Sequence, residues 1–338
     1  MNPVVVTQHR SWFKTRLATF LGGVLLASIV FGLLLIFNVH PEYIGITTTE
    51  VREGGYRFIN PLLECEQESG AIEGSKYNFK DHMNAIIAAK LNTGAVKEVA
   101  VYYRDLNNGP WFGIDENNAF VPASLLKLPI AMAVLRMEES SPGVLQRKVL
   151  ADTSYTLPEG RTQLIAPTKT LEAGKEYTVL ELIEAALKYS DNHALALLYS
   201  VLDTKRLSEL YERLGVPTDV LYKNDATLSV RNYATFFRIL FNASFLSREH
   251  SELLLGLLSQ TEFNDGITAG VPPTVMVSHK FGEAGVVAAH QLHDCGIVYH
   301  RKYPYILCVM GRGSSLKGIE SSIQSISKAA YDAVTKFE

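Results

Sequence analysis

The stretch Phe120-Val121-Pro122-Ala123-Ser124-Leu125-Leu126-Lys127-Leu128-Pro129-Ile130 begins with a turn and then becomes apolar, which predicts the start of a buried helix. Ser124 and Lys127 are three residues apart, so both side chains project from one face of this helix about a turn apart. A serine hydroxyl is a weak nucleophile until a neighbour takes its proton, and a lysine that burial keeps neutral can do so. The helix N-terminus adds free N–H groups and a positive dipole end, which favour developing negative charge. The same spacing occurs in an ordinary core helix with a snorkelling lysine, and other parts of the chain must distinguish the two.

The composition is that of a globular protein without a basic surface. The chain has 338 residues, enough for one large domain or two ordinary ones. Its formal net charge of −3 and isoelectric point of about 6.3 give no sign of a nucleic-acid partner. The cysteines Cys65, Cys295 and Cys308 form no CxxC pair and no metal-ligand spacing, so we expect neither a metal nor a cofactor.

One segment near the N-terminus is apolar enough to cross a membrane. Residues 17–39 contain no charge, and a helix of this length spans the roughly 30 Å hydrocarbon core of a bilayer. Arg10, Lys14 and Arg16 precede it, which predicts that residues 1–16 are cytoplasmic and that the chain after Val39 lies outside. No A-x-A-like cleavage site follows, so we expect an uncleaved single-pass anchor in the cell membrane, with a cleaved signal peptide as the alternative.

Beyond the anchor, residues 40–77 are rich in Pro, Gly, Glu, Ser and Thr and predict a linker to a folded domain at 78–338. Period-two and apolar runs predict strands at 99–103, 111–114, 275–280, 295–299 and 305–310. Helices are expected at 79–91 and 316–334, and in the middle of the chain. This order predicts an α+β fold with three α/β/α layers: a five-stranded antiparallel sheet flanked by helices, with an all-helical lobe inserted.

Capping residues predict where the helices of the middle region begin. Thr178 and Glu181 form a capping box, and Asp203, Ser229 and Ser247 each precede an apolar helical pattern. Two helices are expected to meet at a corner in the stretch Ser190-Asp191-Asn192.

Three short motifs follow one another along the chain: Ser124-x-x-Lys127, Ser190-Asp191-Asn192 and Lys280-Phe281-Gly282. The first opens a helix, the second occupies a helix–helix corner, and the third ends a predicted strand. S-x-x-K, S-D-N and K-T-G together are the signature of class A β-lactamases and penicillin-binding proteins. Residues 78–338 therefore resemble the class A β-lactamase catalytic domain in their motifs and in their order of elements.

The resemblance implies a catalytic role for four residues. Ser124 would attack the amide carbonyl and form an acyl-enzyme, while Lys127 would hold or relay the hydroxyl proton. Ser190 would pass a proton to the leaving nitrogen. Lys280 would supply positive charge for a substrate carboxylate and help to set the proton affinity of Ser190.

The resemblance also implies how substrate is bound. Asn192 would bind a substrate side-chain amide, and the backbone N–H groups of Ser124 and Glu283 would form the oxyanion hole. Gly282 would leave room for substrate along the strand edge. Asp191 is expected to cap the following helix rather than to act on substrate.

Two departures from the family pattern stand out. Phe281 replaces the usual Thr or Ser, so a hydroxyl for the substrate carboxylate is missing, and Lys280 and Arg312 are the candidates to replace it. Class A enzymes also carry a glutamate that activates the deacylating water, and the corresponding stretch 216–229 contains none. Asp225 lies about where such a base would be sought, and we expect a capping or turn role for it instead.

Two other groups of residues have alternative interpretations. His290-x-x-His293 with Asp294 could suggest a metal, but a loop entering a strand is the interpretation we favour, with Asp294 structural. Cys295 and Cys308 lie on adjacent predicted strands, where either a disulfide or, more commonly, two buried thiols are found.

The resemblance implies a membrane-anchored serine hydrolase that opens β-lactam amides through a Ser124 acyl-enzyme. The missing glutamate also fits a D,D-peptidase-like penicillin-binding protein that acts on peptidoglycan stem peptides. A third possibility is a binding or sensing module that keeps the pocket but not turnover. The expected partners are a small-molecule β-lactam or a peptidoglycan stem peptide, and the membrane through residues 17–39.

Overall fold

The central sheet is antiparallel and five-stranded, with the order β4-β3-β9-β8-β7. The computed structural model describes residues 46–52, 54–69, 75–107, 111–152, 163–218, 227–286 and 289–336. The strands are β3 (Val96–Asp105), β4 (Trp111–Ile114), β7 (Val277–Val286), β8 (Ala289–Val298) and β9 (Tyr305–Gly313). The five strands expected from the sequence are present, and β3 pairs with β4 as expected.

Strand β9 lies between β3 and β8 and is buried on both faces. Its continuous apolar run is typical of such a strand, and successive side chains enter opposite cores. Ile306, Cys308 and Met310 belong to one core, and Tyr305, Leu307 and Val309 to the other.

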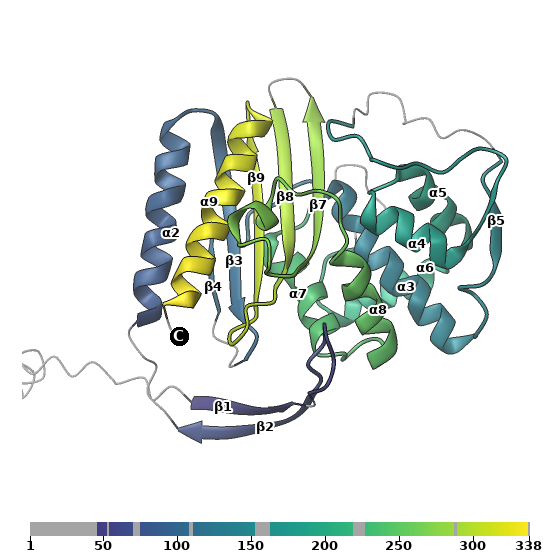
Figure 1. Cartoon of the computed structure of the whole chain (residues 1–338), viewed down its shortest axis with the longest axis horizontal. Coiled ribbons are helices and arrows are strands. Elements are labelled where there is room, and N and C mark those ends of the chain that lie inside the picture. The colour runs from purple at the N-terminus through teal and green to yellow at the C-terminus, as the bar shows by residue number, and fades with distance from the viewer. Residues whose placement is uncertain are drawn as a thin grey trace, which may run out of the picture. The chain divides into compact units, whose positions relative to one another are not determined.

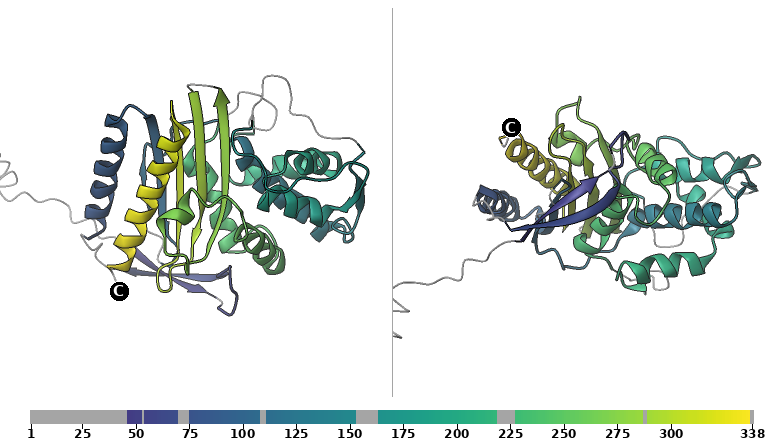
Figure 2. Two further views of the ribbon diagram at one scale, coloured as in Figure 1. Left: turned by 45° about the horizontal axis from the view of Figure 1, so that its top comes forward. Right: turned by 90° about the horizontal axis from the view of Figure 1, so that it is seen from below.

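Helices cover both faces of the sheet (Figures 1 and 2). The helices α2 (Ser75–Asn92) and α9 (Leu316–Thr335) pack on one face, and α7 (Val230–Phe241), with α8 (Arg248–Leu258) beside it, packs on the other. Each face therefore has its own apolar core. This confirms the expected α+β fold in which helices flank a five-stranded antiparallel sheet.

The helical lobe holds the first two motifs. It begins with the 3-10 turn η1 (Ala123–Leu126) and continues with α3 (Lys127–Ser140), α4 (Val179–Lys188), α5 (Asn192–Val201) and α6 (Thr204–Arg213). The predicted capping box and caps are confirmed, because Thr178, Asp203, Ser229 and Ser247 each accept a backbone N–H of the following helix. A two-stranded sheet of β5 (Lys148–Leu150) and β6 (Glu176–Thr178), which the sequence did not predict, also belongs to this region.

Strands β7 and β8 are longer than the sequence predicted. They pair along their whole length, with Lys280 opposite Cys295 and Gly282 opposite His293. The motif Lys280-Phe281-Gly282 therefore lies inside a strand rather than at its end. His290 and His293 lie in β8 rather than in a loop, and Asp294 lies in a strand as expected. The sequence prediction made both strands too short because it excluded their polar residues. The hydrogen-bond partners of those residues lie in distant parts of the chain.

The stretch expected to be a linker contains part of the folded structure. The strands β1 (Ile46–Arg52) and β2 (Leu62–Ser69) pair with each other, and α2 begins before residue 78. Between the strands, Glu252 of α8 accepts backbone N–H groups from Arg57 at 2.9 Å and from Ile59 at 3.0 Å. Residues 48–68 and 73–338 form one compact unit, which holds every residue of the site described below.

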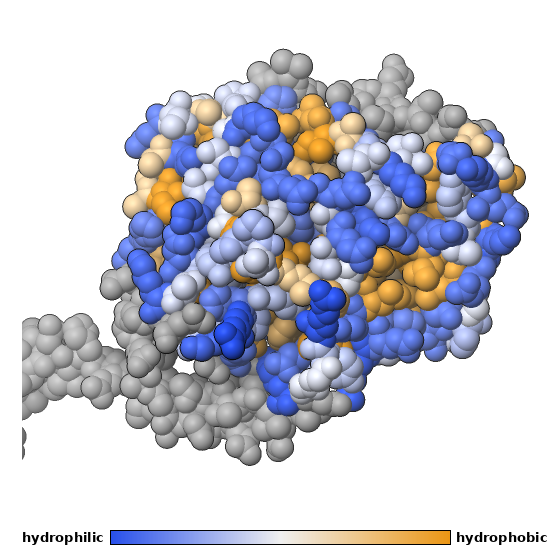
Figure 3. All heavy atoms as spheres, in the orientation of Figure 1, coloured by the Kyte–Doolittle hydropathy of each residue, from blue (hydrophilic) through white to orange (hydrophobic). Residues whose placement is uncertain are grey.

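None of the helices in the described ranges is both long enough and apolar enough to cross a bilayer. The expected anchor, residues 17–39, lies outside the described residues. On the face shown in Figure 3, hydrophilic side chains predominate and hydrophobic ones appear in patches between them, as on most globular surfaces.

Candidate active site

Ser124 and Lys127 meet as the spacing predicts, but the turn between them is tighter than an α-helix. Ser124 lies in η1, and Lys127 is the first residue of α3. Ala123, just before the serine, has a left-handed φ of 48°, an uncommon conformation that occurs often at functional sites. Lys127 Nζ donates to Ser124 Oγ at 3.0 Å.

The Lys127 ammonium is completely buried among oxygen acceptors. Besides Ser124 Oγ, three acceptors lie within hydrogen-bonding distance of Nζ: the Ser190 carbonyl at 2.6 Å, Ser190 Oγ at 3.1 Å and Asn192 Oδ1 at 2.8 Å. These four acceptors share the three N–H groups of the ammonium. Burial lowers the pKa of Lys127 to about 7, although the charges of Asp191 and Glu283 oppose this shift. The amine is therefore partly deprotonated near neutral pH and able to accept the proton of Ser124.

Ser190 is held at the corner between α4 and α5 in a strained conformation. Its φ of 57° is left-handed, and its side chain is buried. Asp191 fixes the corner, since Oδ1 accepts the N–H of Ala194 and Oδ2 that of Leu171, both at 2.9 Å. Asp191 thus caps α5, as the sequence predicted.

Lys280 reaches the same hydroxyl from the sheet. Its Nζ donates to Ser190 Oγ and to the Phe281 carbonyl, both at 3.0 Å. Burial, and then the charge of Lys127, lower the pKa of Lys280 well below its ordinary value. Two amines therefore flank one serine hydroxyl, an arrangement suited to passing a proton along the row.

Packing against the turn of the nucleophile requires a glycine at position 282. A Cβ at this position would lie 2.8 Å from the Pro122 carbonyl oxygen and 3.0 Å from the Leu125 nitrogen. The absence of a side chain lets β7 approach η1, which carries the nucleophile. This packing role is additional to the expectation that Gly282 leaves room for substrate along the strand edge.

A segment that the sequence did not single out lies between Asn192 and Glu283. Asn192 Nδ2 donates to Gln163 Oε1 at 3.0 Å, and the N–H of Leu164 donates to Glu283 Oε1 at 3.0 Å. Burial raises the pKa of Glu283. Its Oε2 is buried without a hydrogen-bond partner among the described residues. Gln163 carries no sequence signal because its partner is 29 residues away.

Distant elements hold the turn that carries the nucleophile. His293 of β8 contacts the Val121 carbonyl at 3.0 Å through Nε2, and Tyr233 of α7 donates to the Leu125 carbonyl at 2.8 Å. Burial lowers the pKa of His293 to about 4, so the ring is neutral at pH 7 and Nε2 donates. No group of three metal-ligating side chains occurs in the described part of the chain.

The residue before Lys280, His279, belongs to a buried histidine–aspartate pair. His279 Nδ1 contacts Asp294 Oδ1 at 2.8 Å, and Asp294 Oδ2 accepts the N–H of Ile267 at 2.8 Å. The Asp294 charge favours the protonated form of Lys280. Asp294 therefore has the structural role expected from the sequence.

Two further expectations concerned the cysteines and Asp225. Cys295 and Cys308 face each other on β8 and β9 and form a disulfide, rather than the pair of thiols that is more common. Asp225 lies outside the described residues.

The comparisons with known proteins agree with this geometry. The beta-lactamase enzyme family matches residues 78–334. The structure of PBP-A is similar at a TM-score of 0.63 and 21% identity, covering 77% of this chain and 96% of that chain. A beta-lactamase from Chitinophaga pinensis has a TM-score of 0.66 at 20% identity, covering 76% and 99%. A class A beta-lactamase from Mycobacterium abscessus has a TM-score of 0.60 at 21% identity, also covering 76% and 99%. At these identities the structures show a shared fold, while the family match shows that the chain belongs to the beta-lactamase enzyme family, with a domain of the class A beta-lactamase and penicillin-binding-protein type.

Proposed function

We propose that this protein is a serine hydrolase that opens β-lactam amides through an acyl-enzyme on Ser124. The observation that carries the proposal is the pair formed by Ser124 Oγ and Lys127 Nζ, 3.0 Å apart, with the pKa of the lysine lowered to about 7. A neutral amine at this distance can remove the hydroxyl proton as the oxygen attacks.

The proposed acylation moves one proton in two steps. As Ser124 Oγ bonds to the carbonyl carbon, its proton passes to Lys127 Nζ. The carbon–nitrogen bond then breaks, Ser190 Oγ gives its proton to the leaving nitrogen, and Lys127, 3.1 Å away, restores that proton. The backbone N–H groups of Ser124 and Glu283 would stabilise the oxyanion.

We further propose that the acyl-enzyme is long-lived. The stretch 216–229 contains no glutamate to activate a deacylating water. Among the similar structures, a mutant of PBP-A is an acyl-enzyme complex with penicillin G. The absent glutamate also supports a second candidate, a D,D-peptidase-like enzyme acting on peptidoglycan stem peptides, and a third, a sensor that is acylated without turnover.

The proposed location is the outer face of the cell membrane, with residues 17–39 as the anchor. The uncharged run and its basic N-terminal flank support this location, and so does the disulfide between Cys295 and Cys308, since disulfides persist in oxidising compartments. Resistance of the protein to carbonate extraction from membranes, together with digestion of the domain by protease added to spheroplasts, would test it.

Labelling with a fluorescent penicillin tests the activity. We expect the purified protein to become covalently labelled and Ser124→Ala to remain unlabelled. Slow loss of the label would support the long-lived acyl-enzyme, and release within seconds would instead indicate an efficient β-lactamase. A slowly released label together with turnover of a stem peptide would favour the peptidase. No labelling of the folded wild-type protein would contradict the proposal.

A further inference from the structure

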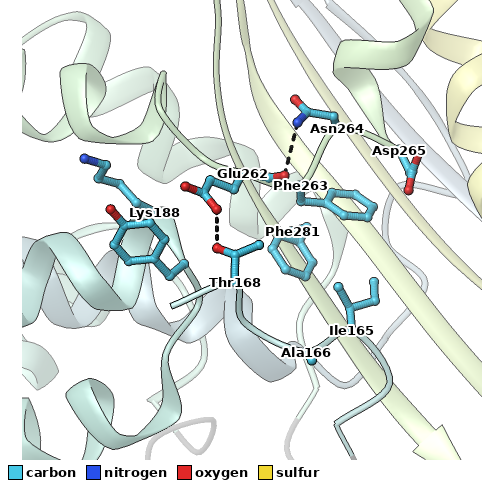
Figure 4. Close-up of a pocket in the computed structure, with 10 residues that line it drawn as sticks. Ile165, Ala166, Thr168, Lys188, Glu262, Phe263, Asn264, Asp265 and Phe281 are labelled. Carbon is cyan, nitrogen blue, oxygen red and sulfur yellow. Dashed lines mark hydrogen bonds between the residues drawn. The ribbon is translucent and has the colours of Figure 1, made fainter. Parts of the chain in front are cut away.

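A pocket (Figure 4) is lined by Tyr189 and Phe281, the residues that directly adjoin Ser190 and Lys280 in the chain. It has a volume of about 140 Å³ and is formed by the segment after Gln163, the end of α4, the stretch before η3 (Ile267–Gly270), and β7. Its main lining residues are Ile165, Thr168, Lys188, Glu262, Phe263 and Phe281. In the proposed reaction Ser190 protonates the leaving nitrogen, so this pocket would hold the group attached to that nitrogen.

Aromatic rings line the pocket where the family pattern has a hydroxyl. Phe281 stacks on Phe263 with ring centroids 4.4 Å apart and an interplanar angle of 27°. The two residues are only 5% and 7% exposed, so the rings are fixed in the wall instead of projecting from it. Ile165, which lies near the two rings, also lines the pocket (Figure 4).

Two protein acceptors and an aromatic ring surround the Lys280 amine and leave little of it for a substrate anion. An ammonium has three N–H groups. Lys280 Nζ donates two of them, to Ser190 Oγ and to the Phe281 carbonyl, both at 3.0 Å, and the centroid of the Phe281 ring lies 4.2 Å from Nζ. The ring therefore covers the cation that would otherwise receive a carboxylate.

Arg312, the other cation that the sequence suggested, is engaged elsewhere. Its Nε lies 2.8 Å from Glu98 Oε2, and its guanidinium donates to the Ala119 carbonyl. The guanidinium carbon lies 4.6 Å from the centre of the Phe120 ring. Arg312 is not among the residues that line the pocket.

The charges around the pocket also disfavour an anion. Glu262 and Asp265 line it, and Glu262 accepts the hydroxyl of Thr168. The lining cation, Lys188, is paired with Glu184 at 2.6 Å. A substrate carboxylate would thus meet two carboxylates and a neutralised lysine.

We propose that this pocket takes an uncharged apolar group of the substrate, about the size of one ring, where related enzymes take a carboxylate. Apolar cavities of about 150 Å³ bind benzene, so the size is suitable. The inference rests on the proposed function, because it places the leaving group of that reaction. It assigns Phe281 and Phe263 as the residues that select an apolar over an anionic group next to the leaving nitrogen.

Acylation rates with penicillin G, its methyl ester and its benzyl ester test the proposal. We expect the wild-type protein to react about tenfold faster with the benzyl ester than with the free acid, and with the methyl ester at an intermediate rate. Phe281→Thr restores the family hydroxyl and uncovers Lys280, so it should reverse the preference. Phe112→Thr on β4, the far edge strand of the sheet, is the matched control and should leave the ratio unchanged.

A wild-type protein that prefers the free acid, or does not discriminate, would overturn the inference whether or not the variants fold. If no penicillin reacts, the proposed function fails, and ligand-observed NMR with benzyl alcohol and benzoate then tests the pocket alone. Binding of benzyl alcohol but not benzoate, lost in Phe263→Ala, would support an apolar pocket. Any other binding pattern would overturn it.

Discussion

Lys127 determines the chemistry of the site because it is a completely buried amine among oxygen acceptors. Its hydrogen bonds to Ser124, Ser190 and Asn192 fix the ammonium, while burial lowers its pKa to about 7. Sequence spacing alone predicted that Ser124 and Lys127 meet, since the contact is local. The contacts from Ser190 and Lys280 followed only from the family motifs, because they join residues 63 and 90 positions apart.

The pKa of Lys127 predicts how acylation depends on pH. The base must be neutral to accept the proton of Ser124, so the rate constant with penicillin G should rise about tenfold per pH unit below pH 7 and level off above it. Stopped-flow measurements between about pH 5 and pH 9 would show this profile. Lys328→Ala removes an exposed lysine of α9 and should leave it unchanged. A flat profile would rule out Lys127 as the base.

At the scale of elements, the sequence predicted the helix starts, which depend on local contacts, and missed the strand lengths, which depend on pairing with distant strands. Helix starts at Thr178, Ser229 and Ser247 were predicted because a cap acts within three residues. The full lengths of β7 and β8 were missed, since their polar residues are satisfied from elsewhere, as Asp294 is by Ile267. No local sequence pattern indicated that the segment at Gln163 contacts the site.

Loss of Asp294 should destabilise the β7–β8 pair strongly. Asp294→Ala leaves His279 and the N–H of Ile267 without their buried acceptor, and each unsatisfied buried group typically costs about 1–3 kcal/mol in the free energy of unfolding. Urea denaturation measures this cost. Asp332→Ala, which removes an exposed ion pair with Lys328, should cost less than about 1 kcal/mol. Equal effects of the two substitutions would refute the role given to Asp294.

Gln163 should compete with the substrate for Asn192. Its side-chain oxygen accepts the Nδ2 hydrogen that a substrate amide would use. Since one neutral hydrogen bond is worth about 1 kcal/mol, Gln163→Ala should speed acylation by penicillin G about fivefold. Aminopenicillanic acid, which lacks the side-chain amide, is the control substrate and should react at an unchanged rate. A slower reaction with penicillin G, or equal acceleration of both substrates, would contradict the competition.

At the scale of the whole molecule, the order of the elements and the motifs predicted the fold and the four residues that converge at the site. What the sequence could not provide was the environment of Lys280. Its burial beneath Phe281 depends on the pairing of β7 and on the stacking of Phe263, neither of which leaves a local pattern. In the proposal above, an apolar wall takes the place of the carboxylate contact that the resemblance implied for Lys280.

The disulfide should stabilise the folded domain as a unit. Cys295 and Cys308 are 13 residues apart, and closing a loop of about 15 residues stabilises by about 3 kcal/mol. A double variant with alanine at both positions should lower the free energy of unfolding by about 2–4 kcal/mol, whereas Cys65→Ala should not. Two free thiols at 295 and 308 in the protein purified without reductant would contradict this prediction.

Peptide mapping by mass spectrometry after exposure to penicillin G tests the central claim most directly. We predict that the peptide containing Ser124 gains the mass of one intact penicillin, and that a Lys127→Ala variant with the circular dichroism spectrum of the wild type gains it at least about a hundredfold more slowly. An adduct on any other residue, or an unmodified Ser124 in the folded wild-type protein, would contradict the account.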